Sequence, residues 1–339
     1  MDMAESMNPS SPIGRPWRCT GTAMAPNLLL MCKLLLGLIL AHGFPATLDD
    51  PFIPFLAVLD GFHAHPGVFA GVMKGLFLAG AIFLMFNVRV REAAMTLGLV
   101  VILTLIASKP QFRNHVFIVG CLFFLAGLHR DREDPWLLRL QFALIYGGAF
   151  INKVLQADWW NGQFMHYWLH RSMRNPWYEM LVPLLPELGV AKVISWTVIA
   201  MELVLAVLFF MPRFTRVAVS LALAMHLGFL AIVGRRVFGH FTEDVLIAML
   251  VFLRWPSGER RIGLGEHLHR ILRPVMPLVD LDRQWVVNQT PPGRWLEVAG
   301  EGKSWHDGSA LWPLLKYNST FYLALFLGFH AVALLLARI

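Results

Sequence analysis

The 339-residue chain has few charged side chains, because only 15% of its residues are Asp, Glu, Lys or Arg. Soluble domains carry roughly a quarter. It also lacks the alternating apolar and polar residues of membrane β-strands, since its apolar residues form continuous runs of about 17 to 22 residues. With 57% hydrophobic residues and a mean hydropathy of +0.57, the sequence predicts an all-α polytopic membrane protein.

The sequence also lacks the motifs of several common metal-binding, nucleotide-binding and hydrolytic sites. The three cysteines, Cys19, Cys32 and Cys121, form no CxxC pair and no metal-ligand spacing, so they indicate neither a disulfide framework nor a zinc site. The sequence has no Walker loop, dinucleotide-binding glycine pattern, nucleophile elbow, HExxH helix or internal repeat, and we expect no bound metal. The net charge of +7 is better explained by basic cytoplasmic loops than by a nucleic-acid partner.

Four parts of the chain differ in composition. The first 26 residues are polar and are predicted to be disordered. Residues 27–255 hold eight apolar runs and form the expected transmembrane domain. Residues 256–316 are polar, with an amphipathic surface helix expected at 258–273 and a small β-hairpin at 294–308. Residues 317–339 would add a terminal membrane helix, which gives a bundle of about eight to nine helices with a small cytoplasmic C-terminal segment.

Basic residues set the expected orientation. Arg and Lys are concentrated after the second, fourth, sixth and eighth apolar runs, which predicts a cytoplasmic N-terminus in a multi-pass protein of a bacterial inner membrane. The lipid bilayer is therefore the first expected partner. In this topology the start of the fourth run and the end of the fifth lie on the same outer side. His115 and Lys153 would then share one cavity.

One segment, residues 137–162, combines an apolar run with polar groups. It carries Gln141 and Tyr146 and ends at Lys153, which is followed by Asp158 and the interfacial Trp159. A lysine at a helix end often reaches water along its apolar stem, and this is the simpler interpretation. The alternative is a functional amine in a cavity, because desolvation near hydrocarbon favours the neutral form that a base requires.

Two further charges lie within apolar runs and need partners. Lys33 is in the first run and Glu202 is near the middle of the sixth. A charge in a membrane span is costly unless it is paired or faces a wet cavity. Lys33 and Glu202 are therefore candidate partners of each other, in a structural ion pair or in a functional site. The seventh run holds His226, which a polar interior would satisfy best.

These residues support a resemblance. The segment IYGGAFINKVLQADWWNG, residues 145–162, is similar to the Y…AG…K…DW..G segment of vitamin K-dependent γ-carboxylases and their bacterial HTTM relatives. In the same order as in that family come an Asn-His pair (Asn114 and His115), an acidic residue in a later span (Glu202) and a histidine in the next (His226). Lys33 stands where the family usually has an arginine. The resemblance covers about residues 27–255, and the interval from Lys153 to Trp159 is one residue longer than in the family.

The resemblance implies a reaction. Lys153 would deprotonate a reduced lipid quinone, either reduced vitamin K or menaquinol, whose oxidation by O2 to the epoxide would drive proton removal from a glutamate and addition of CO2. His115 would act with Lys153 in catalysis, and a secreted or membrane protein would be the substrate. Further residues would bind the cofactor or support the site. Cofactor-binding residues would be Asn114, His226, Tyr146, Gln141 and Trp159; the structural polar residues would be Lys33, Glu202 and Asp158.

The alternative is a non-catalytic membrane module of the HTTM type that binds a lipid or a peptide. A module of this kind has no need of a basic lysine together with an Asn-His pair, so these residues favour the enzyme.

Overall fold

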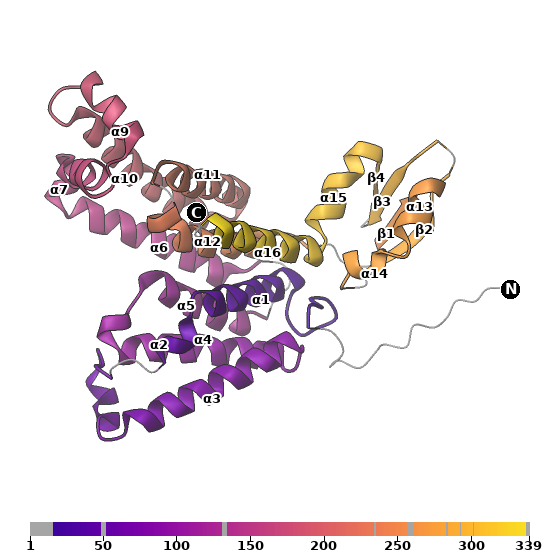
Figure 1. The fold of residues 1–339 in the computed structure, drawn as a ribbon, viewed down its shortest axis with the longest axis horizontal. Helices are drawn as coiled ribbons and strands as arrows, with labels where there is room; N and C mark the ends of the chain where they lie inside the picture. Colours follow the sequence, from indigo (N-terminus) through magenta and orange to yellow (C-terminus); the bar gives the residue numbers. More distant parts are fainter. Residues whose placement is uncertain are drawn as a thin grey trace. The chain divides into compact units, whose positions relative to one another are not determined.

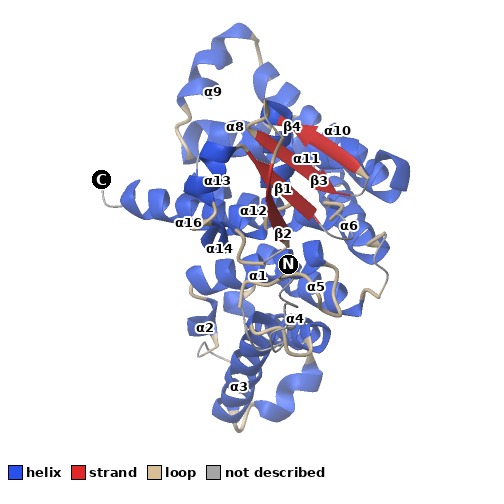
Figure 2. Cartoon of the chain, turned by 90° about the vertical axis from the view of Figure 1, so that its right-hand side faces the viewer, coloured by secondary structure: helices blue, strands red, loops and turns tan. Residues whose placement is uncertain are grey.

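The computed structural model describes residues 16–48, 52–130, 134–233, 235–255, 260–282, 284–291, 293–300 and 302–336. Helices dominate the described chain, and a small sheet lies near the C-terminus (Figures 1 and 2). The chain divides into two compact units: residues 1–130 with 253–339, and residues 131–252. The prediction of a mostly helical protein is confirmed, whereas the prediction that it is all-α is wrong because of the sheet.

The first unit contains apolar helices from the N-terminal third of the chain. They are α1 (Pro26–Ala41), α2 (Phe44–Thr47), α3 (Pro66–Met85), α4 (Val90–Ala107) and α5 (Asn114–Leu128), with short 3₁₀ turns at Ala57–Phe62 and Lys109–Gln111. Helices α4 and α5 approach closely at two glycines. A Cβ atom on Gly98 would lie 2.6 Å from the Gly120 carbonyl oxygen, so only a residue without a side chain fits there.

The second unit consists of three long helices, a series of short helices between the first two, and a further helix of 14 residues after the third. They are α6 (Trp136–Val154), α7 (Ala157–Trp160), α8 (Gln163–His166), a π-helix (Tyr167–Ser172), α9 (Pro176–Leu181), α10 (Gly189–Phe210), α11 (Thr215–Val233) and α12 (Arg235–Ala248), with 3₁₀ turns at Val182–Leu184, Pro212–Phe214 and Met249–Phe252. Helix α6 packs along α10, and α11 packs against α10 and α12. This packing brings the candidate site residues of α6, α10 and α11 together.

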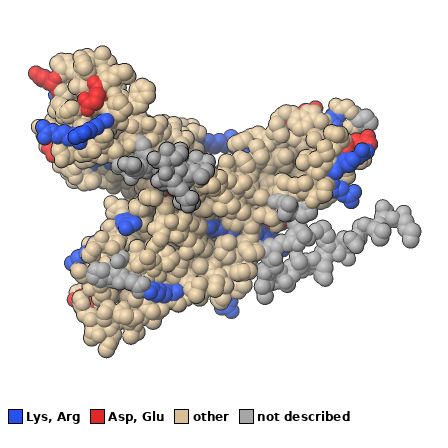
Figure 3. Space-filling model, viewed as in Figure 1, with Lys and Arg blue, Asp and Glu red and all other residues tan. Residues whose placement is uncertain are grey.

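Four helical stretches are long and apolar enough to cross a membrane. They are Pro66–Met85, Val90–Ala107, Gly189–Phe210 and Pro212–Val233. Two further apolar helices, Pro26–Ala41 and Asn114–Leu128, are shorter than 18 residues, and a third apolar stretch, Ser319–Ala331, lies within a longer helix near the C-terminus. At about 1.5 Å per residue the first two fall short of a hydrocarbon core of about 30 Å. The structure thus supports a membrane protein with four candidate spans among the described residues, and the count of eight to nine stays a prediction. Charged side chains are sparse on the face shown in Figure 3.

The C-terminal part of the first unit holds a four-stranded sheet in the order β2-β1-β3-β4 (Figure 2). Strand β1 (Arg260–Leu264) pairs in parallel with β2 (Trp285–Gln289) and antiparallel with β3 (Leu296–Gly300), which pairs antiparallel with β4 (Lys303–His306). The predicted hairpin is therefore present as β3 and β4. The helix predicted at 258–273 is wrong over β1, where four of the five residues are buried in the sheet. Only α13 (Glu266–Leu272) is helical in this range, and 258 and 259 lie outside the described residues. Helices α14 (Met276–Val279), α15 (Leu311–Lys316) and α16 (Ser319–Leu336) complete the unit.

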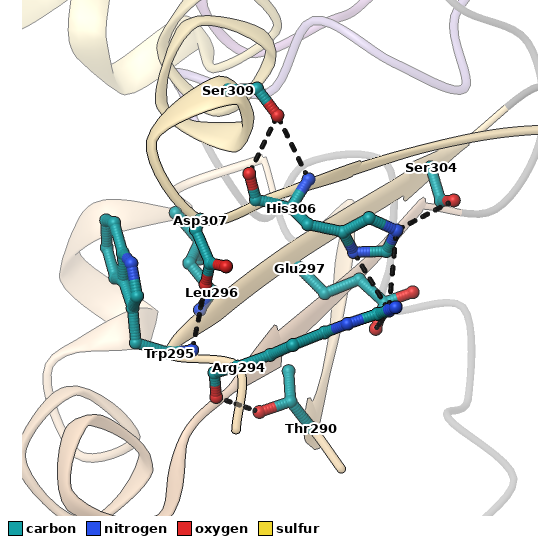
Figure 4. A network of polar contacts seen from close by, with 9 residues as sticks. All are labelled: Thr290, Arg294, Trp295, Leu296, Glu297, Ser304, His306, Asp307 and Ser309. Carbon is teal, nitrogen blue, oxygen red and sulfur yellow. Dashed lines mark hydrogen bonds and ion pairs between the residues drawn. The ribbon is translucent and has the colours of Figure 1, made fainter. Parts of the chain in front are cut away.

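Polar contacts fix the turn that follows the hairpin (Figure 4). The Asp307 carboxylate accepts hydrogen bonds from the backbone amides of Trp295, at 2.9 Å, and Leu296. The Arg294 guanidinium lies 3.1 Å from Nδ1 of His306 and 3.7 Å from Oε2 of Glu297. These contacts are largely exposed, so each contributes modestly and their role is to hold the chain entering α15.

The N-terminal segment differs from the predicted disordered tail from Pro16 onward. Cys19 is fully buried, and the Asp282 carboxylate accepts hydrogen bonds from the backbone amides of Cys19 and Thr20. The buried ammonium of Lys33 donates to the carbonyl oxygens of Pro16 and Arg18 and to Oδ1 of Asn87, at 2.7 to 2.8 Å. Residues 1–15 of the predicted tail lie outside the described residues.

Candidate functional site

The lysine that ends α6 forms a short ion pair in the second unit. Nζ of Lys153 lies 2.6 Å from Oε1 of Glu202, in the middle of α10, and the two side chains are only 16% and 9% exposed. A carboxylate in the middle of an apolar helix needs a partner, and Lys153 supplies it. The predicted pairing of Glu202 with Lys33 is therefore wrong, because Lys33 is bonded to oxygens of its own unit.

The chain that leaves α6 folds back over this ion pair. Nζ of Lys153 lies 4.9 Å from the ring centroid of Trp159, within the range of a cation–π interaction. The Trp159 ring stacks on Phe164 with centroids 4.6 Å apart. Nε1 of Trp160 donates to the Val154 carbonyl at 2.7 Å, which satisfies one of the free carbonyls at the end of α6. The ammonium therefore lies between a carboxylate and an aromatic face.

A glycine makes this fold-back possible. Gly162 has a φ of +80°, and a Cβ atom there would lie 2.8 Å from the backbone nitrogen of Lys192, in the first turn of α10. Both the backbone conformation and the close approach exclude a side chain. The Trp-Trp-Asn-Gly sequence thus places the start of α8 directly against α10. Asp158, in the same stretch, is exposed and forms no ion pair with a residue in the described ranges.

A second polar contact lies two helical turns deeper on the same face of α6. Oη of Tyr146 is 2.9 Å from Nε2 of His226 on α11, and both side chains are buried. The Tyr146 ring stacks parallel to Phe209, with centroids 5.7 Å apart. Tyr146 and Lys153 are seven residues apart, as are Glu202 and Phe209, so the two antiparallel helices meet in two layers about 10 Å apart. Gln141, one turn and a half before Tyr146, is buried as well.

The structure brings five of the predicted site residues together in the second unit. These are Lys153, Glu202, Trp159, Tyr146 and His226. Asn114 and His115 lie on the first turn of α5 in the first unit, and their predicted pocket with Lys153 stays a prediction. The direct Lys153–Glu202 contact was missed, since a single sequence shows that two spans carry opposite charges but not which residues meet.

The comparison with protein families falls on this same unit. Residues 134–255 match the HTTM domain. The match covers nearly the same stretch as the second unit, residues 131–252. The resemblance to the HTTM family is thus confirmed for this part of the chain, which is shorter than the expected 27–255. No curated protein and no solved structure matches the chain.

The HTTM segment contains every candidate residue of the two layers. Lys153, Glu202, Tyr146 and His226 fall within it, whereas Asn114, His115 and Lys33 precede it. The HTTM domain is a membrane domain related to vitamin K-dependent carboxylases. A likeness to the carboxylases themselves stays a prediction.

Proposed function

We propose that this protein is a membrane enzyme that uses Lys153 as a base on a reduced lipid quinone and couples the oxidation of the quinone by O2 to carboxylation of a substrate. The observation that supports this function best is the Lys153–Glu202 contact within the HTTM segment. The reduced quinone, vitamin K hydroquinone or menaquinol, is a substrate that supplies the reducing electrons and leaves as its epoxide.

A base must have a way to become neutral, and Glu202 supplies one. The ammonium of Lys153 is hydrogen-bonded to Glu202 at 2.6 Å, so a proton shift along this bond gives a neutral amine and a neutral carboxylic acid. Exclusion of water favours the neutral pair over the ion pair, because charges lose more than neutral groups in a low dielectric. A bound quinone that displaces water would thus produce the base. The amine then takes the proton of a quinol hydroxyl.

The surroundings of Lys153 suit an aromatic ligand. The face of Trp159 lies beside Nζ, and Tyr146 with Phe209 forms a flat aromatic layer deeper in the unit. Oη of Tyr146 and Nε2 of His226 share one hydrogen bond, whose direction depends on the tautomer of the imidazole. Where the imidazole donates, the Tyr146 hydroxyl can donate to a quinone oxygen; where the Tyr146 hydroxyl donates, its oxygen can accept from a quinol hydroxyl. These residues would orient the ring while the amine removes the proton.

The test separates quinol oxidation from carboxylation. Purified protein in lipid nanodiscs receives reduced vitamin K or menaquinol with O2 and bicarbonate, and epoxide and carboxylated product are measured separately. We expect Lys153→Met to abolish epoxide formation while quinone binding is kept. Lys153→Arg should fail nearly as completely, because a guanidinium does not lose its proton. Lys153→Met combined with Glu202→Gln removes the bare carboxylate and serves as a second variant.

Lys192→Met is the matched control, because this lysine lies on α10 of the same unit and forms no ion pair with any residue that the structure describes. It should keep the activity of the wild type. Equal epoxide formation by the wild type and Lys153→Met would reject the lysine base. If the wild type binds quinone but oxidises no quinol, the non-catalytic binding module is the better assignment.

A further inference from the structure

A short helical segment of the second unit carries large apolar side chains on its outer side. Helix α9 continues into the 3₁₀ turn Val182–Leu184, and together they form what we call the α9 segment. Figure 1 shows α9 at one end of this unit. The side chains of Trp177, Met180 and Leu184 are 60%, 60% and 69% exposed. At about 100° per residue, these three positions and Leu181 fall within an arc of about 100°, so they form one apolar stripe.

The other side of the segment is fixed to the unit by hydrogen bonds. Tyr178 is buried, and its Oη lies 2.8 Å from Nδ1 of His166. The Asn175 side chain accepts from the backbone amide of Tyr178 at 2.9 Å, and its amide group donates to the carbonyl of Ile232 on α11. A rotation that buried the apolar stripe would break these bonds. The fold therefore holds the stripe outward.

The segment is amphipathic, which indicates what the stripe contacts. Glu179 lies about 200° around the helix from Trp177, and its carboxylate contacts Nδ1 of His170 at 2.5 Å. The side chains of His170 and Glu179 are 44% and 43% exposed, so this side is open to water. Apolar patches on a surface mark contacts with a partner or a membrane. A helix with one apolar and one polar side suits the boundary between headgroups and acyl chains, where tryptophan is enriched.

The apolar stripe continues along the chain into a candidate membrane span. The 3₁₀ turn of the segment packs against α10, and only 33% of the apolar stretch of α10 is buried within the protein. Leu185 is 45% exposed, and Val193 and Trp196 near the start of α10 are 53% and 50% exposed. A helix that crosses the bilayer meets hydrocarbon with such side chains. This continuity favours lipid over a second protein chain as the occupant of the stripe.

We propose that the α9 segment inserts Trp177, Met180 and Leu184 among the acyl chains of the leaflet in which α10 begins. Side chains of such interfacial helices lie about 5–10 Å into the boundary region. Tyr178, on the inner side of the segment, belongs to the same buried apolar cluster as Trp159. The lipid contact thus braces the chain that folds back over Lys153.

The test measures the depth of single spin labels on the full chain in lipid nanodiscs. Cys121→Ser is the background, because Cys19 and Cys32 are fully buried. Met180→Cys and Leu184→Cys are labelled one at a time with a nitroxide. Electron paramagnetic resonance then compares collisions with O2, which concentrates in hydrocarbon, and with a water-soluble nickel chelate. We expect collisions with O2 to dominate at both positions, at a depth of about 5–10 Å below the phosphates.

Glu179→Cys is the matched control, because it lies on the same helix but on the side that is open to water. Its label should collide mainly with the nickel chelate. If the labels at positions 180 and 184 meet nickel as often as the label at 179, the stripe faces water and the proposal is wrong. Few collisions with either reagent would show that another protein chain covers the stripe, which also rejects lipid. The two test positions are exposed, so their labels leave the packed interior unchanged.

Discussion

Removal of Lys153 should destabilise the protein in a way that depends on pH. In Lys153→Met, Glu202 loses the cation 2.6 Å away while its side chain stays 9% exposed in the middle of α10. The cheapest response of such a carboxylate is to take up a proton. With an ordinary glutamate pKa of about 4.3, protonation at pH 7 costs about 3.7 kcal/mol. This agrees with the loss of about 3–5 kcal/mol when one partner of a buried pair is removed.

The pH dependence has a definite sign. The folded variant holds the proton on Glu202, whereas the unfolded chain releases it above a pH of about 4.3, so raising the pH favours unfolding. The penalty should therefore fall by about 1.4 kcal/mol for each unit of lower pH, to about 1 kcal/mol at pH 5. Glu202→Gln should cost less, because Lys153 lies at a helix end and its ammonium can reach water. The double variant Lys153→Met/Glu202→Gln should be less destabilised than the sum of the two single variants.

The assay is unfolding in mixed micelles by sodium dodecyl sulfate, followed by tryptophan fluorescence at pH 5, 6 and 7. Lys192→Met is the control for the loss of a lysine from this unit. A loss in Lys153→Met that is the same at every pH would contradict the buried pair, as would a loss below about 1 kcal/mol at pH 7.

Two further predictions concern the turn after α6 and the topology. Gly162→Ala should destabilise the protein by about 1–3 kcal/mol, because its φ is +80° and the new Cβ would clash with α10; Gly148→Ala, with open space around its Cβ position, should be neutral or slightly stabilising, and thermal unfolding compares the two. Single cysteines at positions 130, 235 and 303 should differ in labelling by a membrane-impermeant reagent: 130 and 303 react from the cytoplasmic side and 235 from the outer side. Labelling of 235 and 303 from the same side would show that the predicted topology is wrong.

Helix positions were predictable from the sequence because apolar runs have an unmistakable length. Helices α3 (Pro66–Met85) and α10 (Gly189–Phe210) begin and end within a residue or two of the second and sixth apolar runs, which the sequence puts at about 67–86 and 190–211. The stretch Arg260–Leu264 was mistaken for a helix, because a short segment with mixed apolar and basic residues fits the periodicity of a helix as well as that of a strand. Its parallel pairing with Trp285–Gln289 joins strands about 20 residues apart in the sequence, and no local pattern indicates this.

The site was predictable as a set of residues but not as a set of contacts. Lys153 and Glu202 stood out because charges in apolar helices are costly. Which of two lysines pairs with Glu202 depends on helix packing, and the candidate taken from the sequence, Lys33, is not the partner that the structure shows.

The contacts of Lys33 have a consequence for biosynthesis. Its ammonium donates to three uncharged oxygen atoms, which are the backbone carbonyl oxygens of Pro16 and Arg18 and Oδ1 of Asn87. Two of these three oxygens belong to chain that leaves the ribosome before α1 does, so most of the shell that replaces water around the cation is already available when the first apolar helix reaches the bilayer. The third arrives only after α3 has been made. The backbone before α1 thus supplies hydrogen-bond acceptors that replace water around the Lys33 ammonium. The order of synthesis therefore lowers the cost of placing a cation in an apolar helix.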